Sequence, residues 1–271
     1  MKSFLPQFTV ATLSMEVPRL RSKIGGIPWG FPREQWPHCC DAPQKLLAQI
    51  CHEPPAIDLG GNDFVLYLFQ CLECCGIGDR GRNAFLLKRD DLVDHSVTVP
   101  EYDKTPELGE PLIGEIFISG WNAVEDGIPE SRLPDFFSEE YRYWSLQGDY
   151  PEIEWFDHNS RFGGSPRWTG NGPQGPPTAP FEFLFQLSTL LYISGNPPRA
   201  DQIGCSINTE GSTFNTQSQM RTKPNAPWSV FHSPKLDHHA VEFTNLGSDG
   251  TLYVFIDRTK SPPKAQWYWN R

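Results

Sequence analysis

Cysteine side chains in the first third of the chain form the pattern most typical of a metal site. A histidine and two cysteines stand together at 38–40, and the run Cys71-Leu-Glu-Cys74-Cys75 follows an expected strand. The first two cysteines of that run form a C-x-x-C knuckle, and structural zinc normally takes its remaining ligands from a second loop. Neighbouring side chains seldom chelate one ion together, so a histidine with one cysteine is a better second pair than two adjacent cysteines. We therefore expect a candidate structural zinc site at His38, Cys40, Cys71 and Cys74.

The same cysteines allow two other interpretations, namely buried or surface thiols and redox chemistry. The chain has seven cysteines, an odd number, and most lie between Cys39 and Cys75, unlike the disulfide framework of a small secreted protein. At the N-terminus, Pro6 and Gln7 interrupt the apolar residues, which is not typical of a signal peptide. A reducing cytoplasm is therefore the expected compartment.

Two glutamines are the next candidates, because Gln49 and Gln186 each place a long amide in an otherwise apolar strand. A buried amide must find hydrogen-bond partners. Each glutamine could hold its neighbouring Gly-Gly-x-Pro turn through backbone hydrogen bonds. Alternatively, the two could line a shared ligand or partner groove together with Trp29 and Trp168, which follow those turns.

Motifs for catalysis are absent from the sequence. There is no G-x-S-x-G, H-E-x-x-H, P-loop or G-x-G-x-x-G pattern. The pair His238-His239 and the isolated Cys205 have no local catalytic signature either. We assign no catalytic residue.

Three blocks of sequence occur twice in the same order, which predicts an internal duplication. The first pair is Ser22-Lys-Ile-Gly25-Gly26-Ile-Pro28 and Ser160-Arg-Phe-Gly163-Gly164-Ser-Pro166. The second aligns alanine, proline, leucine and glutamine at 42–49 and 179–186, and the third is G-x-D-x-x-L-Y-x-F at 61–69 and 247–255. We expect one compact domain made of repeat one (22–89), an acidic connecting segment (90–159) and repeat two (160–271).

Composition and periodicity favour strands over helices. The 26 prolines and 23 glycines indicate many short strands and turns. Strands are expected at 46–50, 66–69, 85–87, 113–118 and 267–269, with an edge strand within 1–21. At 46–50, alternation places Leu46, Ala48 and Ile50 on one face and Leu47 with Gln49 on the other.

The best helix candidate lies within Arg132–Leu146. There Asp135 is the expected cap, and the apolar stripe is formed by Phe136, Phe137, Tyr141 and Trp144. The predicted fold class is α+β and β-rich: an internally duplicated two-lobed unit with mostly antiparallel sheets and pseudo-twofold symmetry.

Charge is concentrated in the middle of the chain. The formal net charge is −10, yet residues 91–160 carry 17 acidic and 3 basic side chains, or −14, and the remainder carries 16 acidic and 20 basic, or +4. No basic stripe for phosphate binding is visible, which argues against nucleic acid as the main ligand. No apolar run approaches a membrane span. The acidic segment is either a solvated face or a surface that attracts a basic protein partner.

The order of these motifs resembles the YwqG-like family of bacterial proteins. The resemblance rests on Ser22 to Pro28, Trp36-Pro37-His-Cys39, Leu46 to Ile50 and Leu66 to Cys71, and on the matching blocks of the second half. It covers most of the chain and implies an α+β fold with a duplicated unit, without an established activity. The first half is also distantly similar to ribosomal-protein chaperones related to programmed-cell-death protein two, which bind a basic client. Adjacent Cys39 and Cys40 depart from their spaced cysteine pair.

Three functions remain open from the sequence. The leading one is a protein-binding module, such as a dedicated chaperone or a toxin-neutralising protein, with an acidic surface for a basic partner. The second is an enzyme or small-ligand binder with a pocket between the repeats, using Gln49, Gln186, Cys205 or His238-His239. The third is a zinc-stabilised scaffold.

Overall fold

The computed structural model describes fifteen stretches of the chain. They are 1–10, 20–26, 28–71, 74, 81–93, 115–138, 140–155, 160–169, 177–193, 208–209, 212–213, 230–233, 238–242, 246 and 250–270. Two cysteines of the sequence analysis, Cys75 and Cys205, lie outside them, and only the backbone is described at His238-His239.

One antiparallel sheet organises the molecule. It has 13 strands, and its path runs β17-β16-β10-β9-β1-β8-β2-β5-β6-β7 with antiparallel neighbours throughout. The bounds along the path are β17 (Lys264–Asn270), β16 (Thr251–Asp257), β10 (Glu182–Ser188), β9 (Arg161–Gly163), β1 (Lys2–Val10), β8 (Ile116–Glu125), β2 (Lys23–Ile24), β5 (Lys45–Cys51), β6 (Phe64–Gln70) and β7 (Arg82–Lys88).

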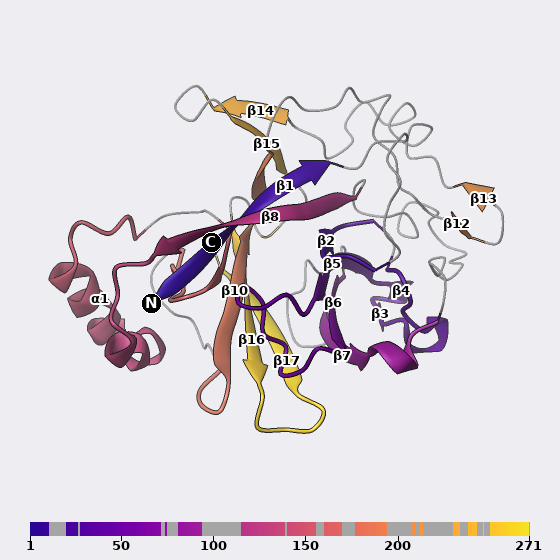
Figure 1. Cartoon of the computed structure of the whole chain (residues 1–271), viewed down its shortest axis with the longest axis horizontal. Coiled ribbons are helices and arrows are strands. Elements are labelled where there is room, and N and C mark those ends of the chain that lie inside the picture. The colour runs from indigo at the N-terminus through magenta and orange to yellow at the C-terminus, as the bar shows by residue number, and fades with distance from the viewer. Residues whose placement is uncertain are drawn as a thin grey trace.

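The two ends of this path meet, so the sheet is a nearly closed barrel (Figure 1). The Trp267 indole N–H on β17 donates to the Asn83 carbonyl on β7 at 3.1 Å. Beside it, the Arg82 guanidinium lies 5.0 Å from the centroid of the Tyr268 ring. Side-chain contacts thus cover edges that would otherwise be open to pairing with another chain.

Short elements decorate the barrel. A branch formed by β11 (Leu190–Ile193), β15 (His238–Glu242) and β14 (Val230–Ser233) leaves the sheet where β11 runs parallel to β1. Two small hairpins are formed by β3 (His38–Cys39) with β4 (Ala42–Pro43), and by β12 (Asn208–Thr209) with β13 (Ser212–Thr213). The helical elements described are the 3₁₀ turns η1 (Arg33–Gln35), η3 (Arg89–Asp91) and η5 (Glu130–Phe137), and the α-helix α1 (Glu140–Asp149).

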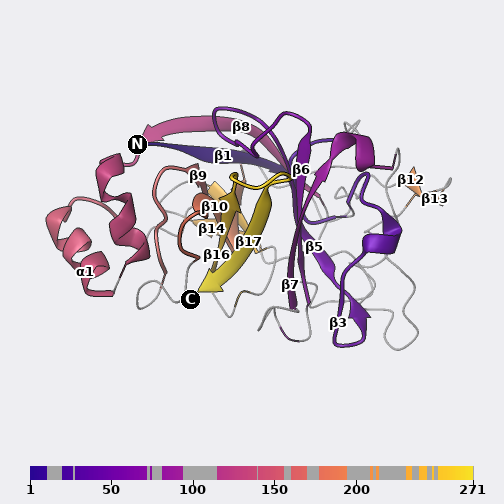
Figure 2. The ribbon, with the colours of Figure 1, turned by 90° about the horizontal axis from the view of Figure 1, so that it is seen from below.

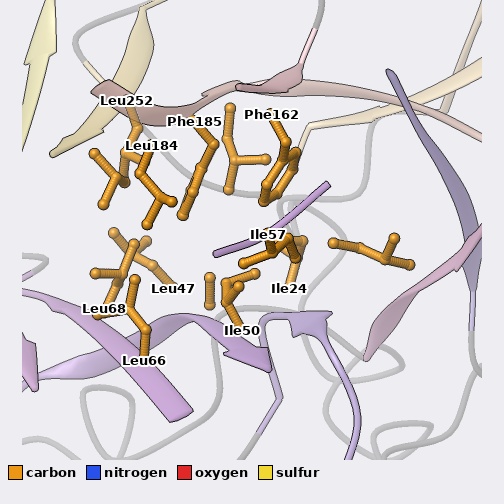
Figure 3. Close-up of a cluster of buried hydrophobic side chains, with 14 of the residues drawn as sticks. Ile24, Leu47, Ile50, Ile57, Leu66, Leu68, Phe162, Leu184, Phe185 and Leu252 are labelled. Carbon is orange, nitrogen blue, oxygen red and sulfur yellow. The ribbon is translucent and has the colours of Figure 1, made fainter. Parts of the chain in front are cut away.

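The main core lies between the strands of the two predicted repeats. Side chains of β5 and β6 meet side chains of β9, β10 and β16 inside the barrel (Figure 3). Each half also has an outer aromatic cluster, one around Phe31 and Tyr67 and one around Trp168 and Tyr253. Because β5, β6 and β16 are buried on both faces, they read as continuous apolar runs rather than as alternating ones.

A β-bulge changes the expected facing of the 46–50 strand. The pairing of β5 with β6 skips Leu47 between Leu46 and Ala48. The extra residue turns Leu47 into the main core beside Ala48 and Ile50, while Leu46 packs in the outer cluster. The prediction that grouped Leu46 with Ala48 and Ile50 was therefore wrong.

The first strand and the helix also differ from their predictions. Strand β1 lies between β9 and β8 in the middle of the sheet path, not at an edge. The predicted helix is divided into η5, which contains Pro134, and α1, which begins at Glu140. Asp135 is no cap, because it lies inside η5 and its carboxylate accepts from Arg132 at 2.7 Å.

The apolar stripe of α1 is also different. Its buried residues are Tyr143 and Leu146, whereas Tyr141 and Trp144 are 60% and 40% exposed. Among the described residues, no helix has the length and apolar character needed to cross a membrane.

Candidate functional site

The candidate site is a cysteine corner formed by the β3–β4 hairpin and the residues that follow β6. The hairpin turn consists of Cys40 and Asp41, whose φ angles are 53° and 57°. Positive φ at both central residues defines a type I′ turn, which joins two strands with the correct twist. Residues other than glycine adopt this conformation at a cost of about 1–2 kcal/mol each. The turn therefore places Cys40 at the tip of the hairpin, next to Cys39 at the end of β3.

Four thiols converge at this corner. The Sγ atoms of Cys39, Cys40, Cys71 and Cys74 all lie within 4.8 Å of one another. Two of the separations, from Cys39 to Cys40 and from Cys39 to Cys74, are 3.7 Å. A zinc ion bonded to sulfur at about 2.3 Å in a tetrahedron needs sulfur pairs about 3.8 Å apart. A disulfide would need about 2.05 Å, so the spacing fits shared coordination of a cation better than a covalent bond.

This group of possible metal ligands differs from the predicted set at a single position. Cys39 belongs to the group of thiols and His38 does not. The Nδ1 atom of His38 instead lies 2.9 Å from the Trp36 carbonyl oxygen, a local contact within the same loop. The left-handed turn at Cys40 is the physical reason, because it brings the side chains of two adjacent cysteines to one place.

Burial of the four cysteines is graded. Cys71 is buried, Cys39 and Cys74 are half-buried, and Cys40 is exposed. An ion could therefore reach the corner from the side of Cys40, while Cys71 anchors it against the end of β6. The aromatic cluster begins directly behind, where the rings of Trp36 and Phe69 are 5.4 Å apart.

The surroundings of Cys39 favour its neutral thiol when no cation is present. Desolvation, followed by hydrogen bonds with the neighbouring thiols, raises the pKa of Cys39 well above its usual range. A thiol that works as a nucleophile needs a lowered pKa instead. A bound cation would reverse the preference, because coordinated cysteine is a thiolate. Outside the corner, burial raises the pKa of the Cys51 thiol to about 11.

The first predicted groove residue, Gln49, holds a loop. It is fully buried, and its Oε1 accepts from the Trp29 backbone N–H at 2.8 Å. Its Nε2 donates to the Arg21 carbonyl at 2.9 Å, and the Tyr67 hydroxyl donates to the Trp29 carbonyl at 2.7 Å. The glutamine and the tyrosine thus secure the residue that follows the Gly-Gly-x-Pro turn.

The second groove residue, Gln186, makes the corresponding contact. It is also fully buried, and its Oε1 accepts from the Arg167 backbone N–H at 2.8 Å. The Tyr253 hydroxyl donates to the Arg167 carbonyl at 2.7 Å, and the adjacent Trp168 is 3% exposed. These contacts are those of residues that hold loops, and a shared groove stays a prediction.

Sequence reasoning overlooked the two tyrosines as partners of the loops. The signal was present, because Tyr67 and Tyr253 occupy the same place in the repeated G-x-D-x-x-L-Y-x-F block. Each pairs across the sheet with the glutamine of its own half, Gln49 and Gln186. A side chain that recurs opposite a buried amide is a candidate member of the same hydrogen-bond network.

Comparison with known proteins gives no family for this chain: no family model matches it, and no curated protein matches it. The resemblance to the YwqG-like family therefore stays a prediction.

Proposed function

We propose that this chain is a zinc-stabilised, protein-binding scaffold. The observation that carries the zinc assignment is the convergence of four thiols within 4.8 Å of one another at Cys39, Cys40, Cys71 and Cys74. Four protein ligands complete a tetrahedral shell, which is typical of structural zinc, whereas catalytic zinc keeps a position open for water or substrate.

The ion would join two segments that are distant in sequence. One is the β3–β4 hairpin, and the other is the chain that leaves β6 at Cys71. The base of the short hairpin is closed locally by the Gln44 N–H, which donates to the Pro37 carbonyl at 2.8 Å, and Asn83 Nδ2 on β7 donates to Gln44 Oε1 at 3.0 Å. Zinc binding would therefore add directly to the stability of this corner.

Metal analysis of the freshly purified chain tests the zinc assignment. We expect about one zinc ion per chain, and we expect Cys74→Ser to lose the ion and to lower the melting temperature of the remaining protein. Cys51→Ser is the matched control, because Cys51 is buried in β5 outside the corner. Metal far below one ion per chain, or equal zinc content in the two variants, would contradict the assignment.

We also propose that the barrel is a duplicated unit, with repeat one at 22–89 and repeat two at 160–271 in a single compact domain. The sheet path supports this, because its members correspond in order from the two ends: β17 with β7, β16 with β6, β10 with β5 and β9 with β2. The bulges support it as well, since β10 skips Leu184 at the place where β5 skips Leu47. Both leucines point into the barrel (Figure 3).

Hydrogen bonds to the first serine of each repeat agree with this correspondence. Ser22 Oγ accepts from the Cys51 N–H at 3.0 Å, and Ser160 Oγ accepts from the Ser188 N–H at 3.2 Å. In an experimental structure, superposition of strands β2, β5 and β6 on β9, β10 and β16 should need a rotation close to a half-turn. A rotation far from that value would remove the pseudo-twofold.

The binding role is supported by where apolar surface remains exposed. Among the described residues, the exposed large hydrophobic side chains are Tyr141 and Trp144, and both lie in the acidic segment. Exposed aromatic residues within a charged rim are typical of interaction surfaces. We expect a basic protein partner, recovered by affinity capture at low salt and released at high salt. Failure to recover any basic partner at low salt would contradict this role.

A further inference from the structure

Helix α1 has two faces that both carry aromatic side chains. Tyr143 and Leu146 point inward and pack in the cluster around Trp155 and Trp168. Tyr141 and Trp144 are exposed, as are Ser145 and Gly148 on the same side of the helix. We call this set, Tyr141, Trp144, Ser145 and Gly148, the outer face of α1.

The spacing of the outer face is that of a packing stripe. Its residues are at i, i+3, i+4 and i+7, the periodicity by which helices bury one side against a partner. Two rings are followed by two small residues, and a Cβ placed on Gly148 would meet nothing within 4 Å. The stripe therefore presents two exposed aromatic rings beside two small residues that leave space along the helix.

The rim of the outer face is acidic. Glu140 and Asp149 are exposed on the helix beside the outer face, and Glu130, Glu152 and Glu154 are exposed in the segments before and after it, against one exposed basic side chain, Arg142. The nearby Arg132 is already bonded to two carboxylates, Asp135 at 2.7 Å and Asp149 at 2.9 Å. A cationic ligand would find complementary charge along this rim.

The rings themselves are disposed to receive a guanidinium group. The Arg142 guanidinium lies 5.9 Å from the centroid of Tyr141, so one ring of the face already carries such a contact. The Trp144 indole N–H donates to Glu140 at 3.2 Å, which orients the larger ring and places a carboxylate beside it. Tryptophan is the best side chain for a cation–π contact, and arginine is its most frequent partner.

We propose that the outer face of α1 binds an arginine-bearing segment of a partner protein. One guanidinium of that segment lies over the Trp144 ring, and its neighbouring basic residues form ion pairs with the acidic rim. The inference rests on the proposed protein-binding role and is independent of zinc. Helix α1 and the β3–β4 hairpin lie at opposite ends of the molecule (Figures 1 and 2), so the two sites can be tested separately.

Charge distinguishes this occupant from two others. A second copy of the chain docked through the same face would bring two acidic rims together, and like charges at an interface disfavour association. An anionic lipid surface would be repelled for the same reason. A positively charged protein segment can make cation–π contacts with the rings and ion pairs with the acidic rim.

The experiment uses the full chain and a fluorescently labelled peptide of alternating arginine and glycine, followed by fluorescence anisotropy. We expect Trp144→Ala to weaken binding by at least about fivefold, because an aromatic anchor at the centre of an interface carries much of the affinity. Trp144→Phe should retain part of it. The charge reversal Glu152→Lys should also weaken binding, whereas Glu34→Lys, a reversal at an exposed position on η1, should change it little. A peptide with lysine in place of arginine should bind more weakly.

Several outcomes would overturn the proposal. These are no binding of the arginine peptide at low salt, equal binding by the wild-type protein and folded Trp144→Ala, or equal effects of the two charge reversals. Sedimentation of the chain alone supplies another test, because a dimer that Trp144→Ala abolishes would assign the face to self-association. Cys74→Ser should bind the peptide normally, so loss of the zinc site and loss of this surface give different results. Recovery of a basic partner whose binding does not depend on α1 would support the binding role and refute its assignment to the outer face of α1.

Discussion

Replacing Gln49 with leucine should destabilise the fold far more than the loss of an ordinary surface hydrogen bond. The substitution keeps a side chain of similar size but replaces the amide with an apolar group, which removes the acceptor for the Trp29 N–H and the donor to the Arg21 carbonyl. Gln49 is fully buried in β5. A fully buried backbone group left without its partner costs about 1–3 kcal/mol; because Arg21 and Trp29 are half-buried, we expect a loss of about 1–3 kcal/mol for the two groups together. That is a large fraction of the stability of a typical domain.

Equilibrium unfolding in urea measures the effect, and the chain provides a matched control. Gln7 on β1 also makes a side-chain hydrogen bond, to Asn122 at 3.1 Å, but this bond is exposed. We expect Gln7→Leu to change the free energy of unfolding by about 0.5 kcal/mol or less. A double-mutant cycle of Gln49→Leu with Tyr67→Phe should show coupling, because both side chains hold Trp29.

A Gln49→Leu protein whose free energy of unfolding lies within about 0.5 kcal/mol of the wild type would refute this role of the buried amide. Equal effects at Gln49 and Gln7 would refute it as well. Either result would mean that the buried amide does not secure the loop after the first Gly-Gly-x-Pro turn.

Three further predictions concern single positions. Gly164→Ala should destabilise the fold strongly, because Gly164 has a φ of +68° and an added Cβ would collide with Ser3 Oγ and lie 2.7 Å from the Asp126 carboxylate. A melting curve near that of the wild type would contradict this prediction. Gly148→Ala should instead stabilise α1 by about 0.5–1 kcal/mol, because an added Cβ has no atom within 4 Å and alanine is the better helix former. A lower melting temperature would contradict this prediction. Burial raises the pKa of Cys51 from 9.0 to about 11, so the unfolded chain loses this proton first and stability should fall between pH 9 and about 11. The fall is at most about 1.4 kcal/mol per pH unit, and a Cys51→Ala protein with the same pH dependence would rule out this thiol as the cause.

Much of the loop architecture could be predicted from the sequence. Gln49 and Gln186 recur at the same place in two apolar strands, and a buried amide has few ways to satisfy its donors and acceptors. The structure indeed bonds each glutamine to the residue that follows its Gly-Gly-x-Pro turn. The repeated strands of the third block, with Tyr67 and Tyr253, are also found as central, fully buried strands.

Features that depend on a single backbone irregularity could not be predicted. The bulge at Leu47 turns Leu47 into the core and leaves Leu46 in the outer cluster, and no glycine or proline marks it. The turn at Cys40 and Asp41 is left-handed without the glycine or asparagine that usually signals it, so adjacent cysteines appeared to be poor joint ligands. Both irregularities are local, yet the bulge decides which leucine enters the core and the turn decides which side chains could bind the metal.

The helix illustrates a different limit. Its aromatic residues were expected to form one buried stripe, but a stripe can be assigned to a face only when the start of the helix is known. Pro134 lies in the 3₁₀ turn that precedes α1, and the α-helix begins later than expected, at Glu140. Tyr143 and Leu146 therefore take the inward positions, and Trp144 is left on the outside.

X-ray absorption at the zinc edge tests the central claim most directly, because it reports the elements bound to the ion and their distances. If Cys39, Cys40, Cys71 and Cys74 hold zinc, the spectrum of the purified chain will fit four sulfur ligands at about 2.3 Å. A shell containing nitrogen at about 2.0–2.1 Å would return His38 to the ligand set in place of a cysteine. Protein that is folded and free of zinc, or zinc bound mainly by oxygen, would contradict the account.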